Sequence, residues 1–202
     1  ISLGLVGSEM CIRDRDMDNS GTIDGSDRRV IGKATPDFTV GWNNTLTYKN
    51  WNLNLFFNGA FGADRLNLAR FTMASMVGDS RFITLREAYT DNFDKVGQSA
   101  IYPGLKVAGN NYQAVSTKWV EDASYVRLEN ISLSYNLSKK VTKFADIRLT
   151  LSCQNLFTIT GYKGMDPVGT TFSNDNVDVD AGIDMGAYPT PRTFTFGVRM
   201  NF

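Results

Sequence analysis

The sequence of 202 residues contains no histidine and only two cysteines, and these scarcities exclude much of enzyme chemistry. Without histidine there is no Ser-His-Asp triad, no imidazole general base and no histidine-ligated metal ion. Lys plus Arg and Asp plus Glu both number 21, so the net charge is zero. A chain with neither a basic excess nor a local basic cluster gives no reason to expect nucleic-acid binding. We therefore expect a protein that is not an enzyme and has no nucleic-acid partner.

Long hydrophobic runs are also missing from the sequence. No stretch reaches about eighteen consecutive apolar residues, so the sequence predicts no transmembrane helix. A strand of a membrane barrel needs only about ten residues of alternating polarity, so the absence of such a run leaves a barrel open. Proline is scarce, whereas aromatic residues make up 12% of the chain. Together with frequent Asn and Thr, this composition favours β structure.

Five segments alternate apolar and polar residues with period two, which is the pattern of a strand with one apolar face. The five segments are 37–49, 51–61, 125–137, 146–157 and 193–202. In the last of them, Phe194, Phe196 and Val198 alternate with polar residues. We expect an all-β protein in which the apolar faces point to one side of an antiparallel sheet.

The connections between these strands alternate in length. Residues 49–50 and 138–145 form short turns, whereas 62–124 and 158–192 form long loops. Short turns at one end and long loops at the other are typical of an outer-membrane barrel. A soluble β-sandwich would also alternate in polarity, but its loops need not alternate in length.

Four aromatic residues lie near the predicted strand ends or within one turn of them: Trp42, Tyr48, Trp51 and Tyr135. One interpretation is an aromatic belt at a membrane interface. The other is the ordinary enrichment of aromatic residues in strands. The sequence alone leaves both open.

Residues 1–15, ISLGLVGSEMCIRDR, do not share the periodicity of the rest of the chain. The stretch resembles a peptide that recurs at the ends of fragmentary predicted proteins, where sequencing-adapter sequence has been translated. We expect it to be non-native, with 16–202 as the native part; the alternative is a genuine strand followed by a charged turn. If the stretch is foreign, Cys11 is foreign too, and Cys153 has no cysteine with which to form a disulfide.

Residues 16–27 have the spacing of an EF-hand calcium loop. The candidate ligands at loop positions 1, 3, 5, 7, 9 and 12 are Asp16, Asp18, Ser20, Thr22, Asp24 and Asp27. Gly21 at position 6 permits the sharp turn that wraps the chain around the ion. Position 12 is Asp, where a bidentate Glu is usual, so any Ca²⁺ binding should be weak. An empty turn held by its own hydrogen bonds is the alternative, and no other cofactor is expected.

Several blocks together resemble the C-terminal region of the SusC/RagA family of TonB-dependent transporters. The blocks are 16–32 (DMDNSGTIDGSDRRVIG), 36–39 (PDFT), 48–57 (YKNWNLNLFF), 125–135 (YVRLENISLSY), 154–158 (QNLFT) with 164–167 (GMDP), and 188–198 (YPTPRTFTFGV). Each block alone is moderately specific. Their occurrence in the expected order over residues 16–202 makes chance similarity a poor explanation.

The resemblance implies that 16–202 form the C-terminal part of a large transmembrane β-barrel, with long extracellular loops and short periplasmic turns. It implies import of glycans or peptides across the outer membrane of Bacteroidetes-type Gram-negative bacteria. The implied partners are outer-membrane lipid, a SusD-like surface lipoprotein and the TonB complex, which would act through parts not found in these residues. We thus expect a fragment that lacks the plug and the TonB-contacting segment. The alternative is a secreted calcium-dependent carbohydrate-binding β-sandwich.

Overall fold

The computed structural model describes residues 19–21, 30–74, 85–100, 102, 117–138, 143, 145–169 and 182–201. The chain divides into two compact units, which are described separately. The first unit comprises 1–33, 65–121 and 170–186, and the second comprises 34–64, 122–169 and 187–202.

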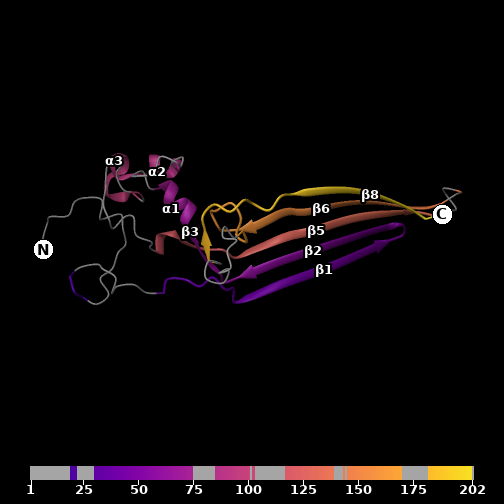
Figure 1. The fold of residues 1–202 in the computed structure, drawn as a ribbon, viewed down its shortest axis with the longest axis horizontal. Coiled ribbons are helices and arrows are strands. Elements are labelled where there is room, and N and C mark those ends of the chain that lie inside the picture. The colour runs from indigo at the N-terminus through magenta and orange to yellow at the C-terminus, as the bar shows by residue number, and fades with distance from the viewer. Residues whose placement is uncertain are drawn as a thin grey trace. The chain divides into compact units, whose positions relative to one another are not determined.

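The second unit is built around one antiparallel sheet of five strands in the order β1-β2-β5-β6-β8. The strands are β1 (Phe38–Tyr48), β2 (Trp51–Phe61), β5 (Tyr125–Leu137), β6 (Asp146–Thr160) and β8 (Thr193–Asn201). Figure 1 shows them side by side. All five predicted strands are confirmed, and β6 extends three residues beyond the predicted end at residue 157. Each strand has at least nine residues, which is about the length a membrane-spanning strand requires.

The β1–β2 hairpin is closed by the two-residue turn that the sequence predicts. The last cross-strand pair is Tyr48 with Trp51, which leaves Lys49 and Asn50 as the turn. Lys49 adopts a positive φ of 52°, as the first central residue of a primed two-residue hairpin turn does. The turn is also tied to β5, because the backbone N–H of Asn136 donates to the carbonyl of Asn50 at 2.9 Å.

A bulge between β5 and β6 keeps the apolar face continuous along both strands. Leu128 pairs with Phe157 and Asn130 pairs with Gln154, so Glu129 faces two residues of β6, Asn155 and Leu156. Asn155 has a positive φ of 53° at this point. Such extra residues bend a strand and restore the inward and outward alternation beyond them.

Short elements lie in or at the edge of the first unit. They are β3 (Asp64–Asn67), α1 (Leu68–Ala74), α2 (Arg86–Thr90), α3 (Phe93–Val96), η3 (Gly97–Ser99), η5 (Thr117–Trp119), β4 (Val120–Asp122) and β7 (Ile183–Asp184). A small core of Ala74, Ala88, Tyr102 and Trp119 packs with three partly buried apolar side chains. None of the helices in the described part of the chain is both long and apolar enough to span a membrane.

Candidate functional site

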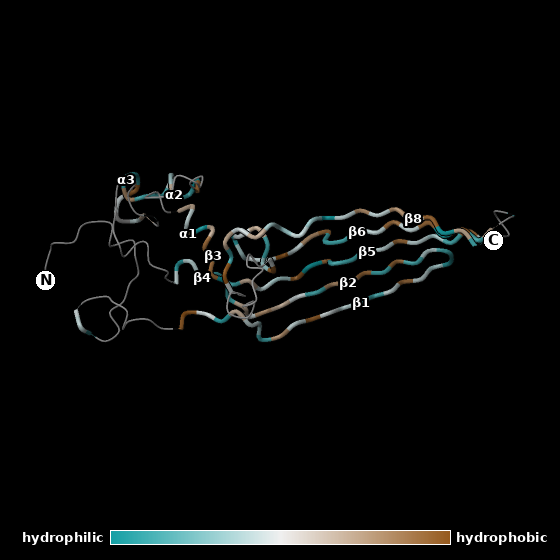
Figure 2. The backbone as a smooth tube through the Cα atoms, viewed as in Figure 1, coloured by the Kyte–Doolittle hydropathy of each residue, from teal (hydrophilic) through white to brown (hydrophobic). Residues whose placement is uncertain are grey.

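The five-stranded sheet has one face covered with exposed apolar side chains. Directly opposed residues in neighbouring strands lie on the same face, and one such row crosses all five strands. The row consists of Leu46, Leu53, Leu133, Leu151 and Phe196. Leu151 is 55% exposed and Phe196 is 68% exposed. Figure 2 shows the alternation of hydrophobic and hydrophilic residues along these strands. An apolar surface of this extent requires apolar surroundings, because burial of apolar area is the main favourable term in folding.

The next row of the same face is aromatic and lies at the short-turn end of the strands. Tyr48, Trp51 and Tyr135 are consecutive partners in β1, β2 and β5. The rings of Trp51 and Tyr135 are 4.6 Å apart between centroids. Trp42 is different, because it is the fifth of eleven residues in β1 and stacks on Phe57. Three of the four aromatic residues therefore occupy the strand ends, and the prediction for Trp42 is wrong.

The opposite face carries neutral polar side chains that bind one another across the strands. Asn54 donates to Asn43 at 3.1 Å and to Thr45 at 2.9 Å, and Asn52 donates to Thr47. The hydroxyl groups of Ser134 and Thr150 lie 3.1 Å apart. These side chains can also bind water, so this face suits an aqueous surface, as the sequence predicts.

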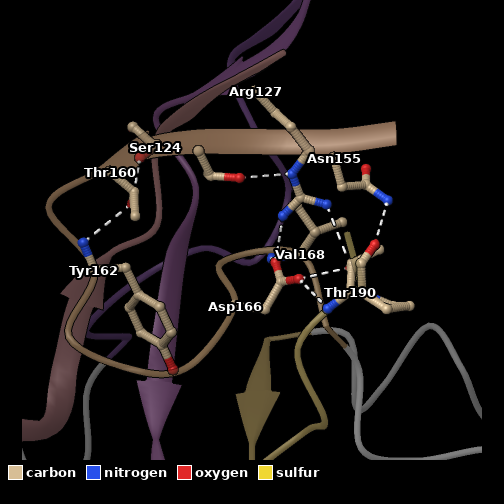
Figure 3. A network of polar contacts seen from close by, with 10 residues as sticks. Ser124, Arg127, Asn155, Thr160, Tyr162, Asp166, Val168 and Thr190 are labelled. Carbon is tan, nitrogen blue, oxygen red and sulfur yellow. Dashed lines mark hydrogen bonds and ion pairs between the residues drawn. The ribbon is translucent and has the colours of Figure 1, made fainter. Parts of the chain in front are cut away.

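At the long-loop end of the sheet, the polar face holds a buried charged network, which Figure 3 shows from close by. Arg127 of β5 donates from Nη2 to Oδ1 of Asp166 at 2.6 Å and from Nε to Thr158 Oγ1 at 2.9 Å. Its Nη1 donates to Thr190 Oγ1 at 3.3 Å. The exposed fractions of the Arg127 and Asp166 side chains are 9% and 4%. A buried ion pair is tolerated only where further hydrogen bonds satisfy both ions, as they do here.

Both carboxylate oxygens of Asp166 accept two hydrogen bonds each. Oδ1 accepts from Arg127 and from the backbone N–H of Val168 at 2.9 Å. Oδ2 accepts from the hydroxyl of Thr190 at 2.7 Å and from its backbone N–H at 3.0 Å. Burial alone would raise the pKa of Asp166, but the bonds from Thr190, Val168 and Arg127 stabilise the carboxylate and lower its pKa from 3.8 to about 2.

This network joins segments that lie far apart in the sequence. Asp166 belongs to the connection after β6, and Thr190 belongs to the connection before β8. Nearby, Asn155 Nδ2 donates to the carbonyl of Pro191 at 3.2 Å. The network therefore fixes the two ends of the 161–192 loop against the wall formed by β5 and β6. Arg127, Asp166 and Thr190 occur in the blocks YVRLEN, GMDP and YPTPR. The alternation of apolar and polar residues did not predict that these blocks contact one another.

A second charged cluster lies within the first unit. Arg70 of α1 donates to Glu121 at 2.9 Å, to Glu87 at 2.6 Å and to the hydroxyl of Tyr102 at 3.0 Å. Burial alone would lower the pKa of Arg70, but the hydrogen bonds and charges of Glu121, Tyr102 and Glu87 outweigh that effect and raise the pKa above its ordinary value. The guanidinium therefore stays charged and links α1 to α2 and β4.

No family model matches the chain. It is 37% identical over 194 residues to TonB-dependent receptor P3 of Formosa agariphila, with 93% of this chain and 18% of that protein covered. It is 27% identical over 192 residues to TonB-dependent receptor SusC of Bacteroides thetaiotaomicron, with 93% of this chain and 17% of that protein covered. A solved structure of the RagAB peptide importer in the open-open state matches with a TM-score of 0.72 and 22% identity, covering 90% of this chain and 19% of that chain.

The resemblance to the SusC/RagA family is confirmed. The chain spans less than a fifth of the length of these TonB-dependent receptors. Its fold is that of a section of the barrel wall of such a transporter, with short periplasmic turns and long extracellular loops. In barrels of this kind the apolar face lies against lipid and the polar face lines the interior. The Arg127–Asp166 network lies at the long-loop end of this sheet.

The alternative of a secreted β-sandwich is not supported. A sandwich covers the apolar face of each sheet with a second sheet, whereas the apolar row of the five-stranded sheet is exposed. The relatives that match the chain are TonB-dependent receptors.

The predicted calcium loop cannot be compared with the structure at most of its positions. Asp16, Asp18, Thr22, Asp24 and Asp27 lie outside the described residues, as do residues 1–15. Of the candidate ligands only Ser20 is described, and Gly21 beside it has a φ of +84°. That left-handed conformation suits a calcium loop and an empty turn equally. No group of acidic or sulfur ligands that could hold a metal occurs in the described ranges.

Proposed function

We propose that the chain forms part of the wall and surface loops of an outer-membrane TonB-dependent importer of glycans or peptides. One observation carries this proposal: a sheet with one continuous, exposed apolar face and one polar face, in a chain similar over 93% of its length to TonB-dependent receptors. Such a sheet is suited to separate lipid from an aqueous interior. Its location in a cell would be the outer membrane of a Bacteroidetes-type Gram-negative bacterium.

The polar face supports a nutrient rich in hydrogen-bonding groups. Its central part presents amide and hydroxyl side chains, among them Asn52, Asn54, Ser134 and Thr150. Amides and hydroxyls both donate and accept hydrogen bonds, so they can bind sugar hydroxyls or peptide groups. The RagAB structure is described as a peptide importer and SusC as a TonB-dependent receptor. Glycans and peptides are therefore both proposed as substrates.

The proposed partners are a SusD-like surface lipoprotein and the TonB complex. The lipoprotein would meet the extracellular side, where the connection between β2 and β5 and the connection between β6 and β8 emerge. The TonB complex would act through parts of the full-length protein outside these residues. A tagged full-length protein purified in mild detergent is expected to bring down one lipoprotein, and copurification of no lipoprotein would contradict this part of the proposal.

The function is tested by deleting the full-length gene and measuring uptake. Cells are given fluorescent oligosaccharides and, separately, fluorescent oligopeptides of similar size. One class is expected to lose uptake in the deletion strain, and inactivation of TonB should cause the same loss. Uptake of both classes at the parental rate in both strains would remove the proposal. A loss that does not depend on TonB would point to a passive pore.

A further inference from the structure

The turn between β1 and β2 places a lysine beside the aromatic row of the apolar face. Lys49 is the first residue of this turn, and its Nζ atom lies 5.2 Å from the centroid of the Tyr48 ring. Tyr48 and its cross-strand partner Trp51 are 68% and 46% exposed and belong to the apolar face. The ammonium group is therefore held at the end of the apolar face, beside exposed rings.

The stability of the turn does not explain a lysine at this position. Lys49 has a φ of +52°, a conformation that Asn, Asp and Gly adopt more readily than other residues do. The turn is also fixed by the hydrogen bond from the N–H of Asn136 to the carbonyl of Asn50. The lysine thus supplies a positive charge where other residues would suit the backbone better.

Acidic side chains are scarce around this charge. Lys49 takes no part in the ion pairs found within the described ranges. Strands β1 and β2 contain no acidic residue, Glu129 of β5 lies at the bulge, and Asp146 of β6 lies on the polar face. The other short connection, residues 138–145, has the sequence SKKVTKFA, with three lysines and no acidic residue. The short-turn end of the apolar face therefore carries a positive charge.

The spacing of the rows fits the successive levels of a lipid molecule. The leucine row begins two residues along the strands from the aromatic row, which is a distance of about 7 Å. Acyl chains suit the leucine row, whereas Tyr and Trp rings are favoured at the level of the headgroups. A lysine just beyond those rings can extend its ammonium group to the phosphate while its methylene groups stay on apolar surface.

We infer that Lys49, together with Tyr48 and Trp51, binds the phosphate of an anionic glycerophospholipid on the periplasmic side of the outer membrane. A zwitterionic lipid carries an ammonium group that offsets its own phosphate, whereas an anionic lipid brings a net charge that basic turns attract. Free phosphate would contact Lys49 without using the aromatic and leucine rows. The inference rests on the proposed function only in placing the apolar face in lipid and the short turns in the periplasm. It does not depend on the nutrient or on TonB.

Photolabelling of the full-length protein in lipid nanodiscs tests the inference. Two preparations contain equal amounts of phosphatidylglycerol and phosphatidylethanolamine with the same acyl chains, and only one of the two lipids carries a photoreactive diazirine next to the glycerol. Mass spectrometry, after digestion with a protease that does not cleave at lysine, measures the label on the peptide that contains Tyr48 and Trp51. The parent protein should be labelled more by phosphatidylglycerol than by phosphatidylethanolamine at this peptide.

Three variants separate the lysine from general effects. Lys49→Asn removes the charge and suits the turn, so the preference for phosphatidylglycerol should fall roughly fivefold, about the effect of one basic residue beside an anionic membrane surface. Lys49→Arg should keep the parental preference. Arg148→Asn is the matched control, because it removes a positive charge from the same end of the sheet but on the polar face. Its preference should also equal that of the parent.

Equal labelling of the parent by the two lipids would overturn the inference. So would a Lys49→Asn variant that keeps the preference, or an Arg148→Asn variant that loses it. Loss of the preference when inorganic phosphate replaces chloride at equal ionic strength would also overturn it, because the site would then bind a free anion and not a lipid. Absence of label from both lipids would contradict the barrel wall as well. None of these readouts uses transport, so a failed uptake experiment is distinguishable from a failed labelling experiment.

Discussion

At the scale of single residues, Asp166 is the position where a nearly isosteric substitution should destabilise the fold most. Replacing Asp166 by Asn removes the charge and leaves Arg127 buried without its ion-pair partner. Breaking a buried pair in this way costs roughly 3–5 kcal/mol. We expect the 161–169 segment of the full-length protein in Asp166→Asn to be cleaved by protease at a lower urea concentration than in the parent.

A double variant separates the ion pair from a general packing defect. The double variant Arg127→Met/Asp166→Asn leaves no unpaired charge. Much of the resistance to protease that the Asp166→Asn variant loses should therefore return. If the double variant is as sensitive as the sum of the two single variants, the two residues act independently and the account of the network is wrong.

The pH dependence of the same contact follows from the lowered pKa of Asp166. The unfolded carboxyl has an ordinary pKa of 3.8 and the folded one about 2. The stabilisation is therefore complete above pH 3.8 and is lost as the pH falls towards 2, because the unfolded form takes up a proton first. Pepsin cleavage of the 161–169 segment should rise over this interval in the parent. The Asp166→Asn variant should show no such step, and a step of equal size there would assign the effect to another group.

Single residues also determine how strongly the predicted calcium loop binds Ca²⁺. Weak Ca²⁺ binding is expected because Asp27 is shorter than the usual Glu at position 12. Calorimetry on the full-length protein should show a Ca²⁺-dependent heat that falls in Asp18→Ala and in Asp24→Ala. The Asp146→Ala variant is the control, because Asp146 lies outside the loop. Absence of heat in the parent would leave residues 16–27 as an empty turn.

At the scale of elements, the two faces of the sheet should differ in their tolerance of charge. Leu53 and Leu151 belong to the apolar row, and Asn54 and Ser152 are the adjacent residues on the polar face. An arginine on the lipid face costs roughly 2–4 kcal/mol at the bilayer midplane and less towards the interfaces, whereas one on the interior face faces water and is better tolerated. We expect Leu53→Arg and Leu151→Arg to lower the amount of heat-modifiable barrel in the outer membrane, with Asn54→Arg and Ser152→Arg near the parental amount. Equal loss on both faces would contradict the assignment of the faces.

The strands could be predicted from the sequence because period two is a local property. Each of the five alternating segments became a strand, and the turn at Lys49–Asn50 was placed correctly. The register across the bulge at Glu129 could not be predicted, because it depends on which residues of β6 oppose it. The contacts of Arg127 with Asp166 and Thr190 were missed for the same reason: they join residues 39 and 63 positions apart. Local patterns carry no information on such pairs.

The short helices and strands of the long connection between β2 and β5 could not be predicted from local patterns either. Residues 62–124 were expected to be a long loop, yet their described part contains seven short strand or helix segments, and Arg70 of one of them pairs with Glu87 and Glu121 of two others. Helices of four to seven residues carry too few turns for a clear period. Their stability comes from the small core and the charged cluster, not from local propensity.

At the scale of the whole molecule, the sheet order determines what this piece can do alone. β1 and β8 are the end strands of the five-stranded sheet. Their outer edges present backbone N–H and C=O groups, and each unsatisfied group in hydrocarbon costs several kcal/mol. A closed barrel removes both edges by pairing them with further strands. We therefore expect these 202 residues, expressed alone with an export signal, to be recovered as aggregates and not as folded membrane protein.

Supplying the missing strands should reverse that outcome. If the rest of the full-length protein is coexpressed as a separate chain, its edge strands can pair with β1 and β8 and close the wall. The measurement is the fraction of the 202-residue chain that is protease-resistant and heat-modifiable in the outer-membrane fraction, with and without the second chain. A rise on coexpression is expected because the second chain supplies the strands that pair with both open edges. A piece that inserts equally well alone would show that its edges are satisfied by other means, and the barrel-wall account of β1 and β8 would have to be abandoned.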